Sequence, residues 1–207
     1  MASPLRARTL RGALVSVGPD EPPRAVVFQY NPDEVTREVG PREAGGGGTG
    51  ADLSRVWGAP AQTVSFTLDL DAADNVGDDR PLAAMGVRAR IAALELMLHP
   101  SLPSAIATSV QHALGTIEIL PATAPLIVLT LGPTLTVPVT LQGLSITEQA
   151  FGPDLTPIRA TVRVSTKVLT YSDLPVTHPG HGLYLVHQAA AEAVALLAPA
   201  AAAAEGG

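Results

Sequence analysis

The sequence contains no cysteine, so it can form neither a disulfide nor a thiolate metal site. Aromatic residues make up only 3% of the chain, and 13 Lys and Arg stand against 19 Asp and Glu, for a formal net charge of -6. This composition excludes the basic, aromatic surface with which proteins usually bind nucleic acid. A signal-peptide core and a run of about 20 apolar residues are also missing, so we expect cytoplasmic assembly without membrane insertion.

What the chain does have is apolar content, 46% over 207 residues, which is enough for one core with appendages. Strict alternation of apolar and polar residues predicts strands at 63–70, 134–142 and 161–168. Shorter strands are expected at 10–17, 26–30 and 126–131. Pro138 cannot donate to a ladder, so we expect a free or bulged edge there. The inward residues would be Val64, Phe66, Leu68, Leu70, Leu135, Val137, Val139, Leu141, Val162, Val164 and Val168.

Helical spacing of apolar residues appears at 81–100, where Val87, Ile91, Leu94 and Leu98 form one stripe between two prolines. This helix should lie against the sheet. The charged residues off the stripe fit either a solvated face or a partner site; they are Arg88, Arg90 and Glu95. A second short helix is expected at 104–114.

Three patterns that could carry chemistry are incomplete. The acidic segment 69–79 has Ala73 where a calcium loop needs an oxygen ligand, and no glutamate closes the loop. His178, His181 and His187 lack a carboxylate or a fourth donor for zinc. The glycine run at 45–50 lacks the Lys-Ser/Thr of a phosphate loop. We therefore expect no catalytic residues, no metal and no cofactor.

One polar turn, Asn31-Pro32-Asp33-Glu34, ends an apolar run. It belongs to the first of several segments that together resemble a known family. In order, the chain contains FQYNPDEV, SFTLDLDA, an amphipathic helix ending LELMLHP, LIVLTLG, and LSITEQAFGPDLTPIRATVRVSTKVLTYSDL. Together these segments, from about residue 10 to 174, resemble the tube-domain family of contractile injection systems. That family is related to phage tails and includes adaptors that link the inner tube to the spike.

The resemblance implies a mainly β (α+β) fold: an antiparallel, tube-like β-barrel or sandwich with one packed amphipathic helix, assembled as a sixfold ring. On this basis residues 1–174 form the tube-like domain, and 175–207 form a linker and an alanine-rich C-terminal helical tail. Many relatives carry a LysM module after the tube domain, but its Val-x-x-Gly-Asp-Thr-Leu signal is absent here.

A glycine-rich loop at about 40–56 interrupts the predicted domain. Gly45, Gly46, Gly47 and Gly48 give it a flexible backbone. We expect this loop to become ordered against a neighbouring subunit or ring; the alternative is a disordered surface loop. Trp57, the only tryptophan, could anchor the loop or fill the core of its own domain.

The tail GLYLVHQAAAEAVALLA places Leu185 and Leu196 on one helical line, beside further apolar residues that include Tyr184. A single helix of about 15 residues is marginal alone in water, so we expect this one to dock on its own domain or on a baseplate neighbour. The alternative is a disordered alanine-rich extension.

The expected function is a non-catalytic structural one. The protein would be a hexameric ring component of a phage-tail-like particle that is released or acts at the cell envelope, and an adaptor between the inner tube and the spike or baseplate. Two alternatives stay open: a tube-terminating cap subunit of the same particle, and a free-standing small-ligand-binding β-barrel that uses the three histidines.

Overall fold

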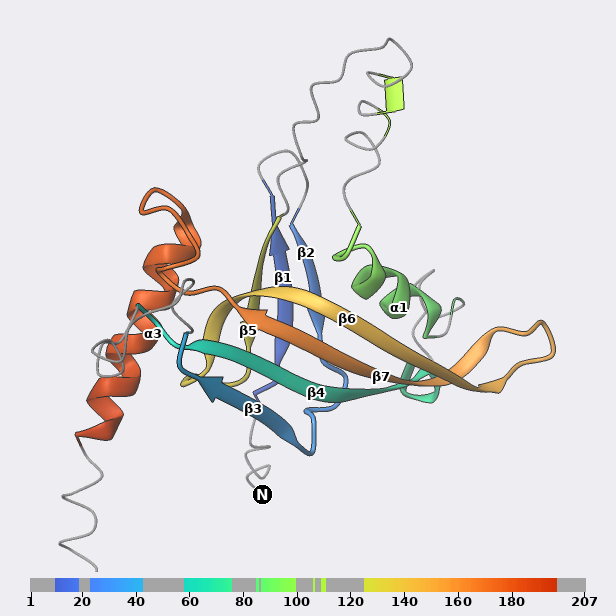
Figure 1. Ribbon diagram of the computed structural model, residues 1–207. Coiled ribbons are helices and arrows are strands. Elements are labelled where there is room, and N and C mark those ends of the chain that lie inside the picture. The colour runs from blue at the N-terminus through green and yellow to red at the C-terminus, as the bar shows by residue number, and fades with distance from the viewer. Residues whose placement is uncertain are drawn as a thin grey trace, which may run out of the picture.

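The computed structural model describes residues 10–18, 23–42, 58–75, 85, 87–99, 106, 109–110 and 125–196. In this part of the chain, one antiparallel sheet has the strand order β2-β1-β5-β6-β7-β4-β3 (Figure 1). The strands are β1 (Ala13–Val17), β2 (Arg24–Val27), β3 (Val35–Gly40), β4 (Ala61–Asp71), β5 (Leu126–Thr130), β6 (Thr136–Phe151) and β7 (Pro157–Val168). The protein is mainly β as expected, but the sheet is not closed into a barrel.

The core lies on the face of the sheet that the alternating pattern predicted. All the inward residues expected in the three main strands are buried, and those of β4 pair in register with β7, for example Phe66 with Val164. Phe28, just after β2, packs its ring against Phe66 with the ring centroids 5.4 Å apart. The end of β2 and the middle of β4, which are far apart in the strand order, therefore face each other across this core.

Strand β6 joins the two halves of the sheet. Its first residues pair with β5, and from Val139 onward it pairs with β7. The prediction of a free or bulged edge at Pro138 holds in part: Pro138 pairs with β5, the ladder with β7 begins only at Val139, and the bulge falls later, between Leu141 and Gly143. The proline is tolerated because it lies one residue outside the β6–β7 ladder.

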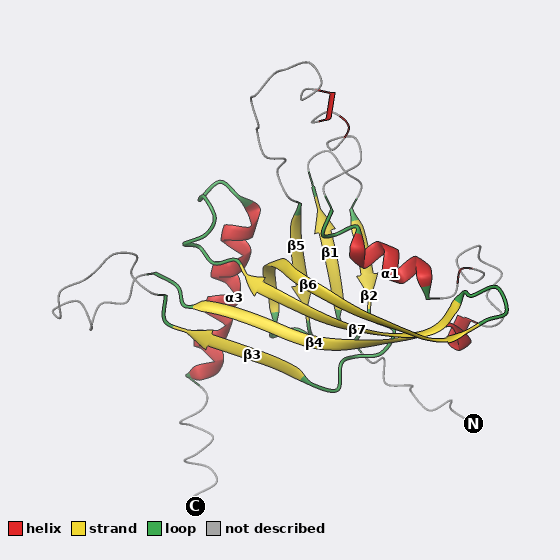
Figure 2. Cartoon of the chain, turned by 45° about the vertical axis from the view of Figure 1, so that its right-hand side comes forward, coloured by secondary structure: helices red, strands yellow, loops and turns green. Residues whose placement is uncertain are grey.

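The two helices whose bounds the structure describes cover different parts of the sheet (Figure 2). Helix α1 (Arg88–Glu95) contacts β2, and α3 (Pro179–Ala195) contacts β6. A short 3-10 turn, Ala72–Asn75, follows β4. Within the described ranges, no helix has the length and apolar character needed to cross a bilayer.

Helix α1 is shorter than the helix that the apolar stripe at 81–100 predicted. Val87, Ile91 and Leu94 are buried as expected, but Leu98 is exposed and Met97 is buried in its place. The helix ends at Glu95 and the chain tightens after it, with Met97 N–H donating to Leu94 O at 3.1 Å and Leu98 N–H donating to Glu95 O at 2.9 Å, so the 3.6-residue spacing no longer holds at position 98. The short helix expected at 104–114 lies almost entirely outside the described residues.

Candidate functional site

Four of the predicted interaction residues, Gly45 to Gly48, and Trp57 lie outside the described residues. The structure does describe both ends of this segment. Arg42 precedes it and Ala59 follows it, and both are bound by the same turn, Thr170 to Asp173. The described residues on either side of this segment therefore both lie beside this turn.

An ion pair is the centre of that contact. Arg42 Nη2 lies 2.8 Å from each carboxylate oxygen of Asp173, while Arg42 Nε donates to Ala59 O at 3.3 Å. Asp173 also accepts from the backbone N–H of Thr170 at 3.0 Å and from its hydroxyl at 2.6 Å. Ser172 Oγ accepts from Ala59 N–H at 3.2 Å. We call this set of contacts the Arg42–Asp173 clamp.

The clamp changes the acidity of Asp173. Burial acts to raise the pKa of this carboxyl, but hydrogen bonds from the hydroxyl and backbone of Thr170, together with Arg42, outweigh burial. The pKa is therefore held below its ordinary value of 3.8. The carboxylate is charged, and the clamp intact, at neutral pH.

Helix α3 begins directly after the clamp, and earlier than the tail pattern predicted. His178 caps it, with Nδ1 accepting from Gly180 N–H at 3.1 Å, and Pro179 occupies the first turn. Gly180 is buried, and a Cβ there would lie 2.8 Å from Leu174 and 3.1 Å from Leu126. This glycine therefore allows close packing of the first turn of the helix against Leu174 and Leu126.

The first half of α3 docks on its own domain through Tyr184. This ring is buried and contacts the rings of Tyr171 and His187, with centroid distances of 5.9 and 6.2 Å. Burial raises the pKa of Tyr184, and burial together with Arg37 lowers that of His187, so both side chains are neutral at pH 7. The expected docking is thus confirmed for this half of the helix.

The second half of α3 has a different environment. Every described residue from Ala189 to Leu196 is exposed. Leu185 also points away from the core, in contrast to its neighbour Tyr184. The exposed large apolar side chains on the helix are Leu185, Val186, Val194 and Leu196. We call this surface the outer face of α3.

The three histidines near this helix are held in separate roles. His178 caps the helix, His181 has its ring centroid 6.5 Å from that of Tyr171, and His187 packs on Tyr184. Among the residues with described positions, no group of three or more metal-ligating side chains comes together. In the acidic segment, Asp71 instead forms an ion pair with Arg159 at 2.8 Å.

The polar turn Asn31–Glu34, which we call the elbow, is tied to distant strands. Asn31 Oδ1 accepts from Gly12 N–H at 2.9 Å, and Asn31 Nδ2 donates to Leu10 O at 2.8 Å. Two residues earlier, Gln29 is buried and exchanges hydrogen bonds with the backbone of Asp71 at 2.7 and 3.0 Å. The motif FQYNP thus connects β2 to β1 and β4. Sequence reasoning assigned it only a turn.

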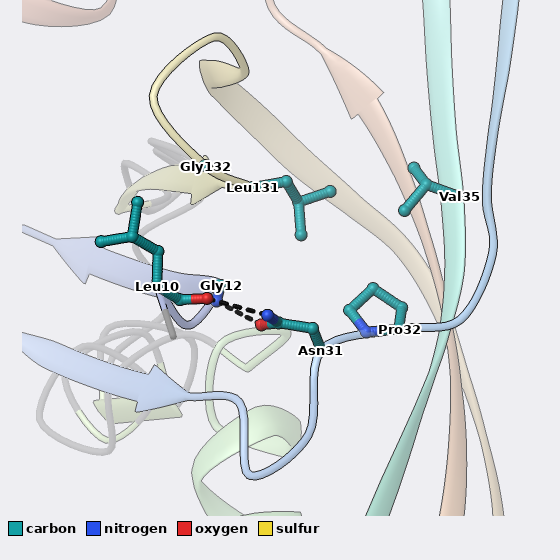
Figure 3. Close-up of a pocket in the computed structure, with 7 residues that line it drawn as sticks. All are labelled: Leu10, Gly12, Asn31, Pro32, Val35, Leu131 and Gly132. Atoms are coloured by element: carbon teal, nitrogen blue, oxygen red, sulfur yellow. Dashed lines mark hydrogen bonds between the residues drawn. The ribbon is translucent and has the colours of Figure 1, made fainter. Parts of the chain in front are cut away.

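A cavity of about 270 Å³ opens beside the elbow (Figure 3). Leu10, Pro32, Val35 and Leu131 supply most of its side-chain wall. Gly12 and Gly132 contribute backbone, and Asn31 directs its carboxamide toward Leu10 and Gly12, as the dashed lines show. We call it the elbow cavity.

The β6–β7 hairpin runs out past the rest of the sheet (Figure 1). Its two strands stay paired as far as Phe151 and Pro157. The five residues between them, Gly152–Thr156, form what we call the hairpin tip. Phe151, Leu155 and Ile158 are exposed there.

Comparison with protein-family models gives no match to this chain, and comparison with curated proteins gives none either.

Proposed function

We propose that this protein is a non-catalytic, ring-forming subunit of a contractile phage-tail-like injection particle, where it links the inner tube to the spike or baseplate. The order of motifs from FQYNPDEV to TYSDL suggests the family. The observation that carries the proposal is the open sheet, which has two different edges suited to joining copies of the chain.

Strands β2 and β3 are these edges. In the described part of the chain, β2 pairs only with β1 and β3 pairs only with β4. An edge strand presents unpaired backbone N–H and C=O groups that favour pairing with another strand. Exposed valines lie on both, Val27 on β2 and Val39 on β3. Pairing of β3 with β2 of the next copy would extend the sheet from subunit to subunit.

The two edges are not equivalent, which bears on the symmetry of the assembly. A contact between different surfaces of identical chains is heterologous, and it closes into a ring when the rotation between subunits permits. We expect a hexamer, in keeping with the family resemblance. A closed ring also removes both free edges, so no aggregation-prone edge would remain.

A partner outside the ring needs a second surface, and the outer face of α3 supports this part of the proposal. Exposed apolar side chains at Leu185, Val186 and Leu196 are unfavourable in water unless a neighbour covers them. We propose that a baseplate or spike protein packs here. This contact would take the place of the LysM contact of relatives.

Native mass spectrometry and particle imaging test the ring directly. The wild-type protein, alone or mixed with its tube and spike partners, should give closed rings, with the hexamer as the main species. A protein that stays monomeric under all these conditions would refute the proposal.

A pair of proline variants tests the edge. In a strand, successive backbone N–H groups point to opposite sides. Of the two variants Glu38→Pro and Val39→Pro, one therefore removes a hydrogen bond to β4. The other removes only an N–H that points away from β4, toward the next subunit in the proposed ring. The variant that keeps the wild-type unfolding midpoint should lose ring formation. Rings of normal abundance from that variant would show that β3 is not the joining edge.

A further inference from the structure

Helix α3 begins with a cap that requires a neutral histidine. His178 Nδ1 accepts from Gly180 N–H at 3.1 Å, so this nitrogen cannot itself carry a proton. Serine, threonine, asparagine and aspartate are the usual residues at such a position, and none of them becomes a cation. A protonated His178 would lose the cap bond and place a positive charge at the helix N-terminus, where the helix dipole disfavours cations. Acid therefore weakens the first turn of α3.

A second histidine lies where α3 meets the rest of the domain. The His187 ring is half-buried and packs on Tyr184, with the ring centroids 6.2 Å apart. Burial and the positive charge of Arg37 on β3 both lower the pKa of His187, and a hydrogen bond with the Thr134 backbone opposes them only in part. The docked helix thus favours the neutral ring at this position too.

The strands beside His187 do not compensate a positive charge on its ring. In the amide orientation that satisfies both groups, the Gln62 carboxamide oxygen accepts from Arg37 Nε at 3.0 Å and from Nη2 at 2.8 Å, which holds the guanidinium in place. Glu38 follows Arg37 on β3 and points to the opposite face of the strand. Strand β6, on which α3 packs, has no charged residue before Glu148, near its far end. An imidazolium at His187 would therefore meet Arg37 without a counter-ion from these strands.

Two carboxylates lie on the turn before α3 and on the helix itself, and each already has a partner. Asp173 is bound by Arg42 at 2.8 Å. Glu192, in the exposed second half of the helix, accepts from Gln188 at 3.0 Å. The other titratable rings of this cluster cannot supply a negative charge in mild acid; they belong to Tyr171, Tyr184 and His181.

We propose that the docking of α3 is acid-sensitive: between about pH 7 and pH 5, protonation of His178 and His187 loosens the helix while the sheet stays folded. The pKa of His187 is lowered in the docked state, so its contribution to docking is complete above the ordinary value of 6.5 and is lost as pH falls from there to the docked value. Linkage limits the change in the docking equilibrium to about tenfold per pH unit for each histidine. The Arg42–Asp173 clamp stays intact in this range, because the pKa of Asp173 is held below 3.8.

This inference goes beyond the proposed function, because it concerns a single chain and needs neither a ring nor a partner. If a baseplate or spike protein binds the outer face of α3, acid would also loosen the connection between that protein and the sheet. The test below uses the full-length protein alone. Its failure would leave the proposed function standing, and a protein that forms no ring could still show the acid-sensitive docking.

Hydrogen exchange of the full-length protein measures the docking. The reporter amides lie in the first half of α3, around Tyr184, and the reference amides lie in β7; both are corrected for the intrinsic exchange rate at each pH. From about pH 7.5 to about pH 5, the opening equilibrium constant of the reporter amides should rise about fivefold or more. The β7 amides should stay better protected than those of α3 at both pH values. No rise in α3, or α3 and β7 amides that open together, would overturn the inference.

Substitutions that cannot be protonated test whether the two histidines cause the rise. In the double variant His178→Asn with His187→Gln, asparagine keeps a capping oxygen and glutamine keeps an uncharged polar side chain. This variant should keep the protection of α3 at neutral pH and lose its pH dependence. The matched control is His99→Gln, at an exposed histidine beyond α1, which should keep the wild-type response. A double variant that keeps the full pH dependence would contradict the assignment.

A nuclear magnetic resonance titration of the His187 Cε1–H signal gives a readout that does not depend on how the double variant folds. In the wild type the midpoint should lie below the ordinary pKa of 6.5, and Arg37→Gln should move the midpoint upward by removing the positive charge. A wild-type midpoint at or above 6.5 would overturn the inference.

Discussion

Replacing Asp173 by alanine should lower the free energy of unfolding by about 2–4 kcal/mol. The carboxylate accepts three kinds of hydrogen bond: from Thr170 N–H, from the Thr170 hydroxyl and from Arg42. Hydrogen bonds to a charged group contribute about 1.5–3 kcal/mol each but are not additive. The side chains of Arg42 and Asp173 are 29% and 16% exposed. Water can therefore hydrogen-bond to some of the groups that the substitution leaves unpaired, and for this reason the expected loss of stability is smaller than the sum of the separate hydrogen bonds.

The effect of pH follows from the lowered pKa of Asp173. A depressed folded-state pKa means that the clamp stabilises the protein fully above the unfolded value, near 3.8, and that this contribution is lost as pH falls through the lower folded value. The stability difference between wild type and Asp173→Ala should therefore be constant near neutral pH and shrink in acid below pH 3.8.

Urea unfolding of the full-length protein, followed by circular dichroism from neutral pH down to acid, measures both effects. Asp33→Ala is the matched control, because this exposed aspartate lies on the elbow surface and its loss should change stability by less than about 0.5 kcal/mol. If Asp173→Ala behaved like the control at neutral pH, or its deficit did not shrink in acid, the reasoning about the clamp would be refuted.

One further substitution, with its control, and two truncations test the packing. Gly12→Ala should cost about 1–3 kcal/mol, because the new Cβ would lie 2.6 Å from the Phe28 ring, whereas Gly40→Ala, with nothing within 4 Å, should be nearly neutral in thermal unfolding. Truncation after Gln188 should keep the unfolding midpoint but weaken retention in the particle, since only exposed residues of α3 are lost. Truncation after His181 should also lower the midpoint, because it removes buried Tyr184; equal midpoints would contradict that docking.

The sequence predicted the main strands well because their burial follows a period of two. Val64, Phe66 and Leu68 alternate with polar residues through most of β4, and this period of two gives a strand one buried face. Strand β3 was not predicted, because it lacks this period of two. Its residues Thr36 to Val39 are all exposed, so an edge strand without a buried face leaves no periodic signal.

Many of the contacts that could not be predicted from the sequence are hydrogen bonds between polar residues far apart in the chain. Gln29 finds its partner at Asp71, and Arg42 finds Asp173, more than a hundred positions away. A hydrogen-bond partner leaves no local pattern, so a sequence can show a polar residue in an apolar run without showing what it binds. The residues around Leu155 carried a signal, since Gly152-Pro153-Asp154 is a typical turn, but not the left-handed φ of the leucine, which is 60°.

For the predicted interaction residues, too, the local pattern could be predicted from the sequence, whereas the contacts with distant segments could not. The periodicity of the tail correctly gave a helix with apolar surface around much of its circumference, and the structure turns Tyr184 inward and Leu185 and Leu196 outward. That division depends on where α3 meets β6 and on the close approach at Gly180, neither of which is a property of the tail itself. Gly45 to Gly48 and Trp57 remain predictions.

The Arg42–Asp173 clamp places two of the proposed contacts next to each other. Arg42 comes two residues after β3, the proposed joining edge, while Asp173 lies just before α3, whose outer face is the proposed partner surface. Arg37 of β3 is also near enough to α3 to lower the pKa of His187. A protein bound to α3 would therefore act on the same turn that holds the chain leaving the ring edge. If the partner binds a closed ring more tightly than a monomer, reciprocity requires that it also favours ring closure by the same factor, which the ratio of the two dissociation constants measures.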